Sequence, residues 1–141
     1  MLNLLSPANG GTIVKAGDPE WKDAVSGKDA ARGRIRAPNE AIFSFRDGKP
    51  ATFSSFATLI SETNAYIKEF ELLVADKPDG PYRSIRKFVT TDALIVDSPY
   101  QSVQFEPVTA RYVKVKLISA HSLTPGGFNL LGQIRLMGQV Q

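Results

Sequence analysis

The stretch AYIKEFELLVADKPDGPYRSI, residues 65–85, decides the fold class of this chain. From Tyr66 to Ala75 the residues alternate, with Phe70, Leu72 and Val74 on one face and Glu69 and Glu71 on the other. A period of two is typical of a strand that buries one face. The following DKPDGP sets two prolines and Gly80 in a tight turn, so a second strand should run from Tyr82 to Thr90.

A second run, FEPVTARYVKVKLIS at residues 105–119, follows the same rule. Val113, Val115 and Leu117 should point inward while Lys114 and Lys116 face water. The chain closes on LGQIRLMG at residues 131–138, which we interpret as the last strand. Strands that each bury one face predict an antiparallel β-sandwich.

The remaining segments fit this architecture. Residues 2–14 should form two short strands around a turn at 6–11, and residues 17–38 should form long loops. Residues 40–46 alternate up to a turn at 47–50, and an apolar return strand at 52–60 predicts a hairpin. With a further strand at 102–106, the chain should hold about eight strands, at a spacing typical of all-β sandwiches.

Three phrases resemble the discoidin domain, also called the coagulation-factor type C domain. They are IKEFELLVADKPDG at 67–80, FEPVTARYVKVKLI at 105–118 and LGQIRLMG at 131–138, with PVTARYVKV the most specific part. The resemblance implies a galactose-binding-like fold, an antiparallel β-sandwich jelly roll, related to discoidin-type carbohydrate-binding modules. It also implies one discoidin-like domain over residues 1–141 that binds through loops at one end.

Composition limits the class of protein. The 141 residues include no cysteine, so neither disulfides nor thiolate chemistry are available. Residues 1–5 are too short for the apolar region of a signal peptide, and no stretch approaches a membrane span. We expect a domain of a larger exported protein that is extracellular, on the cell surface or periplasmic.

Catalysis is disfavoured by the residues themselves. His121 is the only histidine, it lies in a Ser, Thr, Pro and Gly-rich loop, and no serine has the surroundings of a nucleophile elbow. Glu69 and Glu71 should face solvent and pair with lysines on a neighbouring strand. The basic residues are scattered and lack a recognition motif for nucleic acid. We therefore expect neither an enzyme nor a nucleic-acid-binding protein.

The resemblance raises the question of calcium, because many discoidin-type domains hold it between an early Asp-Gly-Asp loop and a glutamate of the closing strand. Ser26 and Gln133 stand at these two places, and each removes a negative charge. Asp23, Asp29 and backbone carbonyls remain as a weaker set of oxygen ligands. We expect no cofactor, with a calcium ion as the less favoured alternative.

Binding of a sugar requires an aromatic platform beside fixed polar groups. The resemblance implies loop aromatics, here Trp21 and Phe128, as candidates. Trp21 could equally plug the end of the sandwich, and Phe128 could tuck under the sheet. Asn64 and the arginines Arg32 and Arg34 are the candidate hydrogen-bonding groups.

The run Arg-Gly-Arg-Ile-Arg at 32–36 would place its guanidinium groups on one strand face, either as a clamp for an anionic sugar or as a solvated face. A net charge of +3 favours anionic partners. We predict a noncatalytic module that attaches to a polysaccharide or a cell-surface glycan. The alternative is a protein-protein interaction or assembly domain that docks a neighbouring domain or subunit through a flat apolar patch.

Overall fold

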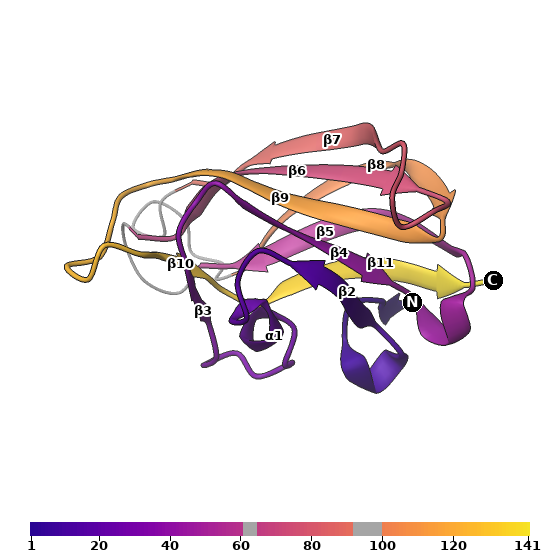
Figure 1. Cartoon of the computed structure of the whole chain (residues 1–141), viewed down its shortest axis with the longest axis horizontal. Helices are drawn as coiled ribbons and strands as arrows, with labels where there is room; N and C mark the ends of the chain where they lie inside the picture. The colour runs from indigo at the N-terminus through magenta and orange to yellow at the C-terminus, as the bar shows by residue number, and fades with distance from the viewer. Residues whose placement is uncertain (61–64, 92–99) are drawn as a thin grey trace.

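The computed structural model describes residues 1–60, 65–91 and 100–141 of the chain (Figure 1). Asn64, one of the candidate ligand-binding residues, lies outside the described residues. The elements in chain order are β1 (Leu2–Asn3), η1 (Pro7–Asn9), β2 (Thr12–Ala16), α1 (Trp21–Ala24), β3 (Gly33–Ile35), β4 (Asn39–Ser44), η2 (Arg46–Gly48), β5 (Ala51–Leu59), β6 (Ile67–Ala75), β7 (Arg83–Val89), β8 (Tyr100–Ala110), β9 (Tyr112–Ala120), β10 (Asn129–Leu131) and β11 (Ile134–Val140).

Two antiparallel sheets face one another. The larger sheet has the order β2-β4-β9-β6-β7 and the smaller one the order β1-β11-β5-β8. A separate pair, β10 and β3, lies at one end of the sandwich (Figure 1). This arrangement confirms the predicted all-β sandwich. The described residues hold eleven strands rather than about eight. β3, which lies in the segment 17–38 predicted as loops, and β10 have only three residues each, too few to show an alternating pattern.

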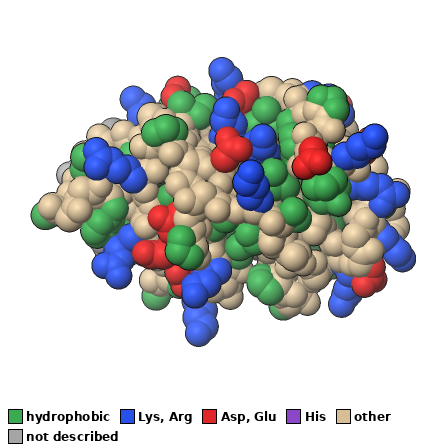
Figure 2. Space-filling model, in the orientation of Figure 1, with side chains coloured by type: hydrophobic (Ala, Val, Ile, Leu, Met, Phe, Trp, Pro, Cys, Tyr) green, Lys and Arg blue, Asp and Glu red, His purple; other side chains and the backbone are tan. Residues whose placement is uncertain are grey.

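The register of the large sheet confirms the strand phase read from the sequence. Leu72 lies opposite Val115, and both are buried on the inner face. Glu71 lies opposite Lys116 on the outer face, as expected for a solvated pair of unlike charges. Figure 2 shows Lys and Arg side chains interspersed with acidic ones over the face toward the viewer.

The predicted hairpin between residues 40–46 and 52–60 is wrong. β4 pairs with β2 and β9, whereas β5 pairs with β11 and β8, so the two strands belong to different sheets. The physical reason is that both carry a large apolar face. Phe45, just after β4, and Phe53 in β5 are both buried and meet in the core with ring centroids 5.6 Å apart, so the chain passes from one sheet to the other between them.

The turn at residues 76–81 forms as predicted, and it joins β6 to β7 as antiparallel neighbours. Gly80 adopts a φ of 88°, a conformation that favours glycine. All helices in the described residues are single turns, and none of them is long and apolar enough to cross a membrane.

Candidate functional site

A hollow of about 680 Å³ opens at the end of the sandwich where α1, β3 and β10 lie. Segments distant in sequence build its wall: the α1 region, the stretch around β3 and the loop between β9 and β10. The lining residues are Glu20, Asp23, Ala30, Ala31, Arg32, Arg34, Thr124, Phe128 and Leu130. The hollow thus brings together three of the predicted binding residues, Arg32, Arg34 and Phe128.

Arg34 and Phe128 form the centre of this site. The Cζ atom of Arg34 lies 5.5 Å from the centroid of the Phe128 ring, a cation-π arrangement. β3 positions Arg34, because its neighbours Gly33 and Ile35 are buried and the alternation turns Arg34 outward. The Arg34 side chain remains 62% exposed, so its guanidinium can still meet a ligand.

Glu20 completes the centre, and the sequence did not single it out. Its Oε1 accepts a hydrogen bond from the backbone N–H of Arg34 at 2.9 Å and lies 3.9 Å from Arg34 Nε. Glu20 therefore fixes both the backbone and the head group of Arg34. No local pattern marks this role, because the partners are fourteen positions apart and join only through folding.

The loop that presents Phe128 is closed by its own hydrogen bonds. The Thr124 N–H donates to the Phe128 carbonyl at 2.9 Å, and the Gly127 N–H donates to the Thr124 carbonyl at 2.9 Å. The buried Asn129 ties the loop to the residues after β3, since its Oδ1 accepts from the Ala37 N–H and its Nδ2 donates to the Ser122 carbonyl. This bracing holds the ring beside the arginine.

Phe128 is half-buried, which lies between the two predicted alternatives, an exposed platform and a ring tucked under the sheet. It packs against Ile60, Ala65, Tyr66 and Leu130, a small apolar cluster apart from the main core. Arg32 lies against the same cluster, where its Nη1 donates to the Tyr66 hydroxyl at 3.4 Å. The site therefore has an apolar base surrounded by both cationic and acidic side chains.

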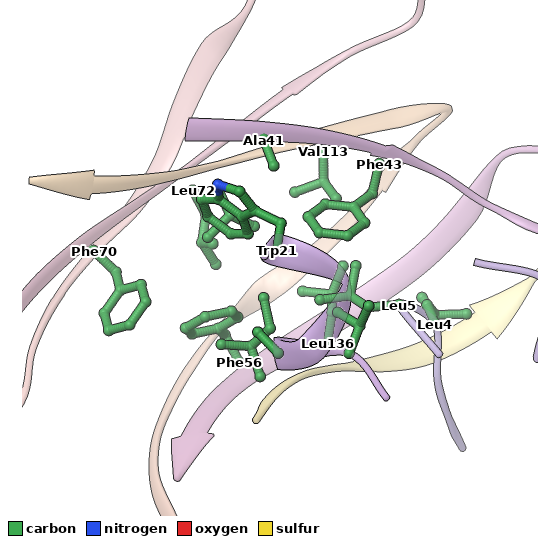
Figure 3. Packing of buried hydrophobic residues seen from close by; sticks show 14 of the residues in the cluster. Leu4, Leu5, Trp21, Ala41, Phe43, Phe56, Phe70, Leu72, Val113 and Leu136 are labelled. Carbon is green, nitrogen blue, oxygen red and sulfur yellow. The ribbon is translucent and has the colours of Figure 1, made fainter. Parts of the chain in front are cut away.

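Trp21 is not an exposed platform, which corrects the candidate role given to it. The side chain is completely buried and meets Phe43 edge-on at a centroid distance of 6.2 Å (Figure 3). Its Nε1–H donates to Asn39 Oδ1 at 2.9 Å, which satisfies its one polar group. The physical reason is that the single turn of α1 directs the indole inward, where it closes the end of the sandwich.

The residues around Gln133 do not fit a calcium ion. The Nε2 of this buried side chain donates to the Asp23 carbonyl at 2.6 Å and the Ala31 carbonyl at 2.9 Å, and it lies 3.3 Å from the Ser26 hydroxyl oxygen. Its Oε1 accepts from the Gly27 N–H at 2.8 Å. The amide thus occupies the point on which these oxygen atoms converge, and a cation there would have to displace it.

The two aspartates predicted as ligands are also separated in role. Asp23 lines the hollow, whereas Asp29 accepts a hydrogen bond from the Tyr100 hydroxyl at 2.9 Å and lies 3.9 Å from Arg135. In the described part of the chain, no three acidic or histidine side chains cluster as metal ligands.

Burial raises the pKa of Tyr100 to about 12. The hydrogen bond to Asp29 adds to this rise, whereas the nearby charge of Arg135 opposes it.

The residues weighed for catalysis make structural contacts. The His121 ring lies 3.0 Å from the Thr90 hydroxyl, through its Nε2. Glu69 accepts a hydrogen bond from Ser119 at 3.3 Å, and Glu71 faces Lys116 across the sheet. These contacts tie strands together rather than lining the hollow.

The fold is that of family 32 carbohydrate-binding modules. The structure resembles a family 32 module from a family 31 glycoside hydrolase of Clostridium perfringens, with a TM-score of 0.73, 13% identity and coverage of 97% of this chain and 96% of that one. It also resembles CpGH89CBM32-5 of C. perfringens, solved in complex with GalNAc-β-1,3-galactose, with a TM-score of 0.67, 19% identity and coverage of 95% and 99%.

A third similar structure is the family 32 module of AlyQ in complex with 4,5-unsaturated mannuronic acid. Its TM-score is 0.63 at 14% identity, with coverage of 90% of this chain and 92% of that one. No protein-family profile and no curated protein matches the chain in sequence. The fold of these similar structures agrees with the galactose-binding-like fold that the sequence resemblance implies.

Proposed function

We propose that the chain is a noncatalytic glycan-binding module that attaches a larger exported protein to a polysaccharide or a cell-surface glycan. The observation that carries this proposal is the hollow in which Arg34 lies over Phe128 beside Glu20. An aromatic ring set among polar groups favours a sugar over the flat apolar patch of an assembly interface. The glycan ligands of structures with this fold support the proposal.

The geometry favours a sugar that carries one carboxylate, such as a uronate. Arg34 lies over the Phe128 ring, so a ligand entering from that side meets the guanidinium before the ring. A planar guanidinium pairs with a carboxylate through two parallel hydrogen bonds. The acids Glu20 and Asp23 on the same wall can accept hydrogen bonds from sugar hydroxyls, and they oppose a densely charged ligand. With few polar anchors, the affinity should be modest.

Isothermal titration calorimetry of the whole chain tests this proposal. The ligands are galacturonate and mannuronate oligosaccharides, heparin oligosaccharides and a neutral galactose-containing oligosaccharide, each at low and at physiological ionic strength. We expect uronate binding that weakens as salt rises, because exposed charges are screened. A neutral sugar that binds equally at both salt concentrations would contradict the uronate assignment but retain glycan binding.

Two variants locate the site. Arg34→Gln removes a charge-assisted contact, and Phe128→Ala removes the ring that lies against Arg34. Each should weaken uronate binding about tenfold or more. Lys15→Gln removes the same charge from an exposed position on β2 and should leave binding unchanged. Failure of every sugar to bind, together with a mass that rises with protein concentration, would favour the assembly domain instead.

A further inference from the structure

A second hollow lies along the seam where the two sheets end. It measures about 720 Å³ and is lined from β7 by Arg83, Ser84, Ile85 and Arg86, and from β8 by Gln104, Phe105, Glu106 and Val108. A smaller hollow of about 360 Å³ continues it toward the turn between β6 and β7, and Arg83 lines both. Among the described residues, β7 pairs only with β6 and β8 only with β5, so the seam runs between two free strand edges.

The floor of the seam is apolar. Ile85, Phe105 and Val108 are partly buried and pack against the main core. The Phe105 ring meets Phe53 edge-on at a centroid distance of 6.5 Å, which holds it in place at the opening between the sheets. The seam therefore offers an inserted side chain a fixed apolar surface.

Two arginines project over this floor. Arg86 lies opposite Leu72 and Arg83 opposite Val74, and both of these β6 partners are buried on the inner face. Paired residues share a face, so the two guanidinium stems point toward the seam rather than toward the outer surface. In the described part of the chain, neither arginine has an acidic partner within ion-pairing distance.

The two free edges differ in their capacity to accept another strand. β8 contains Pro107, which has no N–H, and its pairing with β5 shifts register there. β7 contains no proline, and every residue from Arg83 to Val89 keeps its N–H, although its pairing with β6 has a bulge opposite Leu72 and Leu73. Inward arginines on this edge repel a second copy of β7, whereas they attract a strand that carries carboxylates.

We propose that the seam binds an extended acidic segment of a partner polypeptide, which adds as a strand to the free edge of β7. Its acidic side chains would lie on the inner face, where they meet Arg83 and Arg86 above the apolar floor, and the side chains between them would point to the outer surface. Glu106 borders the β8 side of the seam, so the carboxylates must face β7. The module thus has a protein-binding edge in addition to its glycan-binding end.

A nuclear magnetic resonance titration of the ¹⁵N-labelled whole chain tests this inference. The probe is a capped hexapeptide of alternating Glu and Val, with a Lys and Val hexapeptide as control. We expect saturating shifts of the β7 amides with the acidic peptide alone. The double variant Arg83→Gln, Arg86→Gln should weaken peptide binding about tenfold, because it removes two exposed charge pairs. Lys87→Gln, on the outer face of the same strand opposite Glu71, should leave it unchanged.

Strand addition and simple charge attraction are separated by the peptide backbone. In a strand, alternate residues direct their N–H and C=O groups to opposite edges. We therefore compare a peptide N-methylated at its Glu residues with one N-methylated at its Val residues. One of the two peptides should lose binding and the other should keep it. Equal effects of both modifications, or no response of the β7 amides, would overturn the proposal.

The proposal would also be overturned if a heparin oligosaccharide shifted the β7 amide resonances and the acidic peptide did not. The seam would then bind a sulfated glycan. Arg34→Gln should not change peptide binding, because Arg34 lines the other hollow. The outcome is therefore independent of the proposed uronate site.

Discussion

Phe70 in β6 and Trp21 in α1 are buried equally well, but for different reasons. Phe70 belongs to an alternating strand whose own pattern predicts which face lies inside. Trp21 lies in a segment without periodicity, and its burial depends on Phe43 and Asn39, which arrive from β4. The comparison shows that the alternation of neighbouring residues specifies one part of the core. The other part forms only when segments distant in sequence come together.

The largest expected effect tests whether the irregular segment is as much a part of the core as the strands. Trp21→Ala and Phe70→Ala should each lower the free energy of unfolding by about 3 to 5 kcal/mol. Lys22→Ala, an exposed position on the same turn as Trp21, should change it by less than about 0.5 kcal/mol. Urea unfolding followed by circular dichroism measures all three. A small cost for Trp21→Ala alone would mean that α1 only covers the core.

Trp21 also offers a probe in the native protein, because it is the only tryptophan. A buried indole should emit at short wavelength and resist quenching by iodide. Sugar binding beside Phe128 should leave this emission unchanged. A strong change on adding uronate would return Trp21 to the binding site.

An intermediate effect is expected at Gln133, which lies between β10 and β11 and closes the irregular loop. Gln133→Glu places carboxylate oxygens against the Asp23 and Ala31 carbonyls and should cost about 2 to 3 kcal/mol in the presence of a chelator. Millimolar calcium should restore part of that loss, because it supplies the missing positive charge. Gln104→Glu, exposed on β8, is the control.

The unmodified chain should melt at the same temperature in chelator and in calcium. A shift of several degrees there would show that carbonyls and aspartates form a calcium site despite the amide.

The smallest effect concerns Tyr100, where β8 contacts the irregular segment through Asp29. Because the pKa of Tyr100 is raised from 10.0 to about 12, folding favours the neutral phenol. This stabilisation is complete below pH 10 and is lost as the pH rises from about 10 to about 12. Tyr100→Phe should therefore lose less stability than the unmodified chain across that range, as measured by urea midpoints. An equal fall in the urea midpoints of both proteins would assign the titration to a group other than Tyr100.

Much of the candidate site was visible in the sequence as single residues. Arg32, Arg34 and Phe128 were expected as ligand contacts, and the fold brings them to one hollow. The sequence did not show that Arg34 would cover Phe128 or that Glu20 would hold Arg34. Those relations join β3 to the segment before α1 and to the loop before β10, and the spacing of these residues along the chain has no period.

The error at β4 and β5 has the same origin. A turn between two apolar strands predicts a hairpin locally, but the choice between pairing and packing across the core depends on β9 and β11. Local chemistry specified a reversal of the chain. It did not specify the sheet to which the next strand belongs.

By itself the sequence determined the all-β class, the inner and outer faces of β6 and β9 and the turn at Gly80, because alternation and turn chemistry act between near neighbours. Only the tertiary structure decided that Trp21 is core, that Gln133 occupies the centre of the early loop, and that Arg83 and Arg86 overhang an open seam. Those features arise where non-neighbouring segments exclude water from one another. Burial and hydrogen bonding at such places are properties of the assembled fold rather than of any one segment.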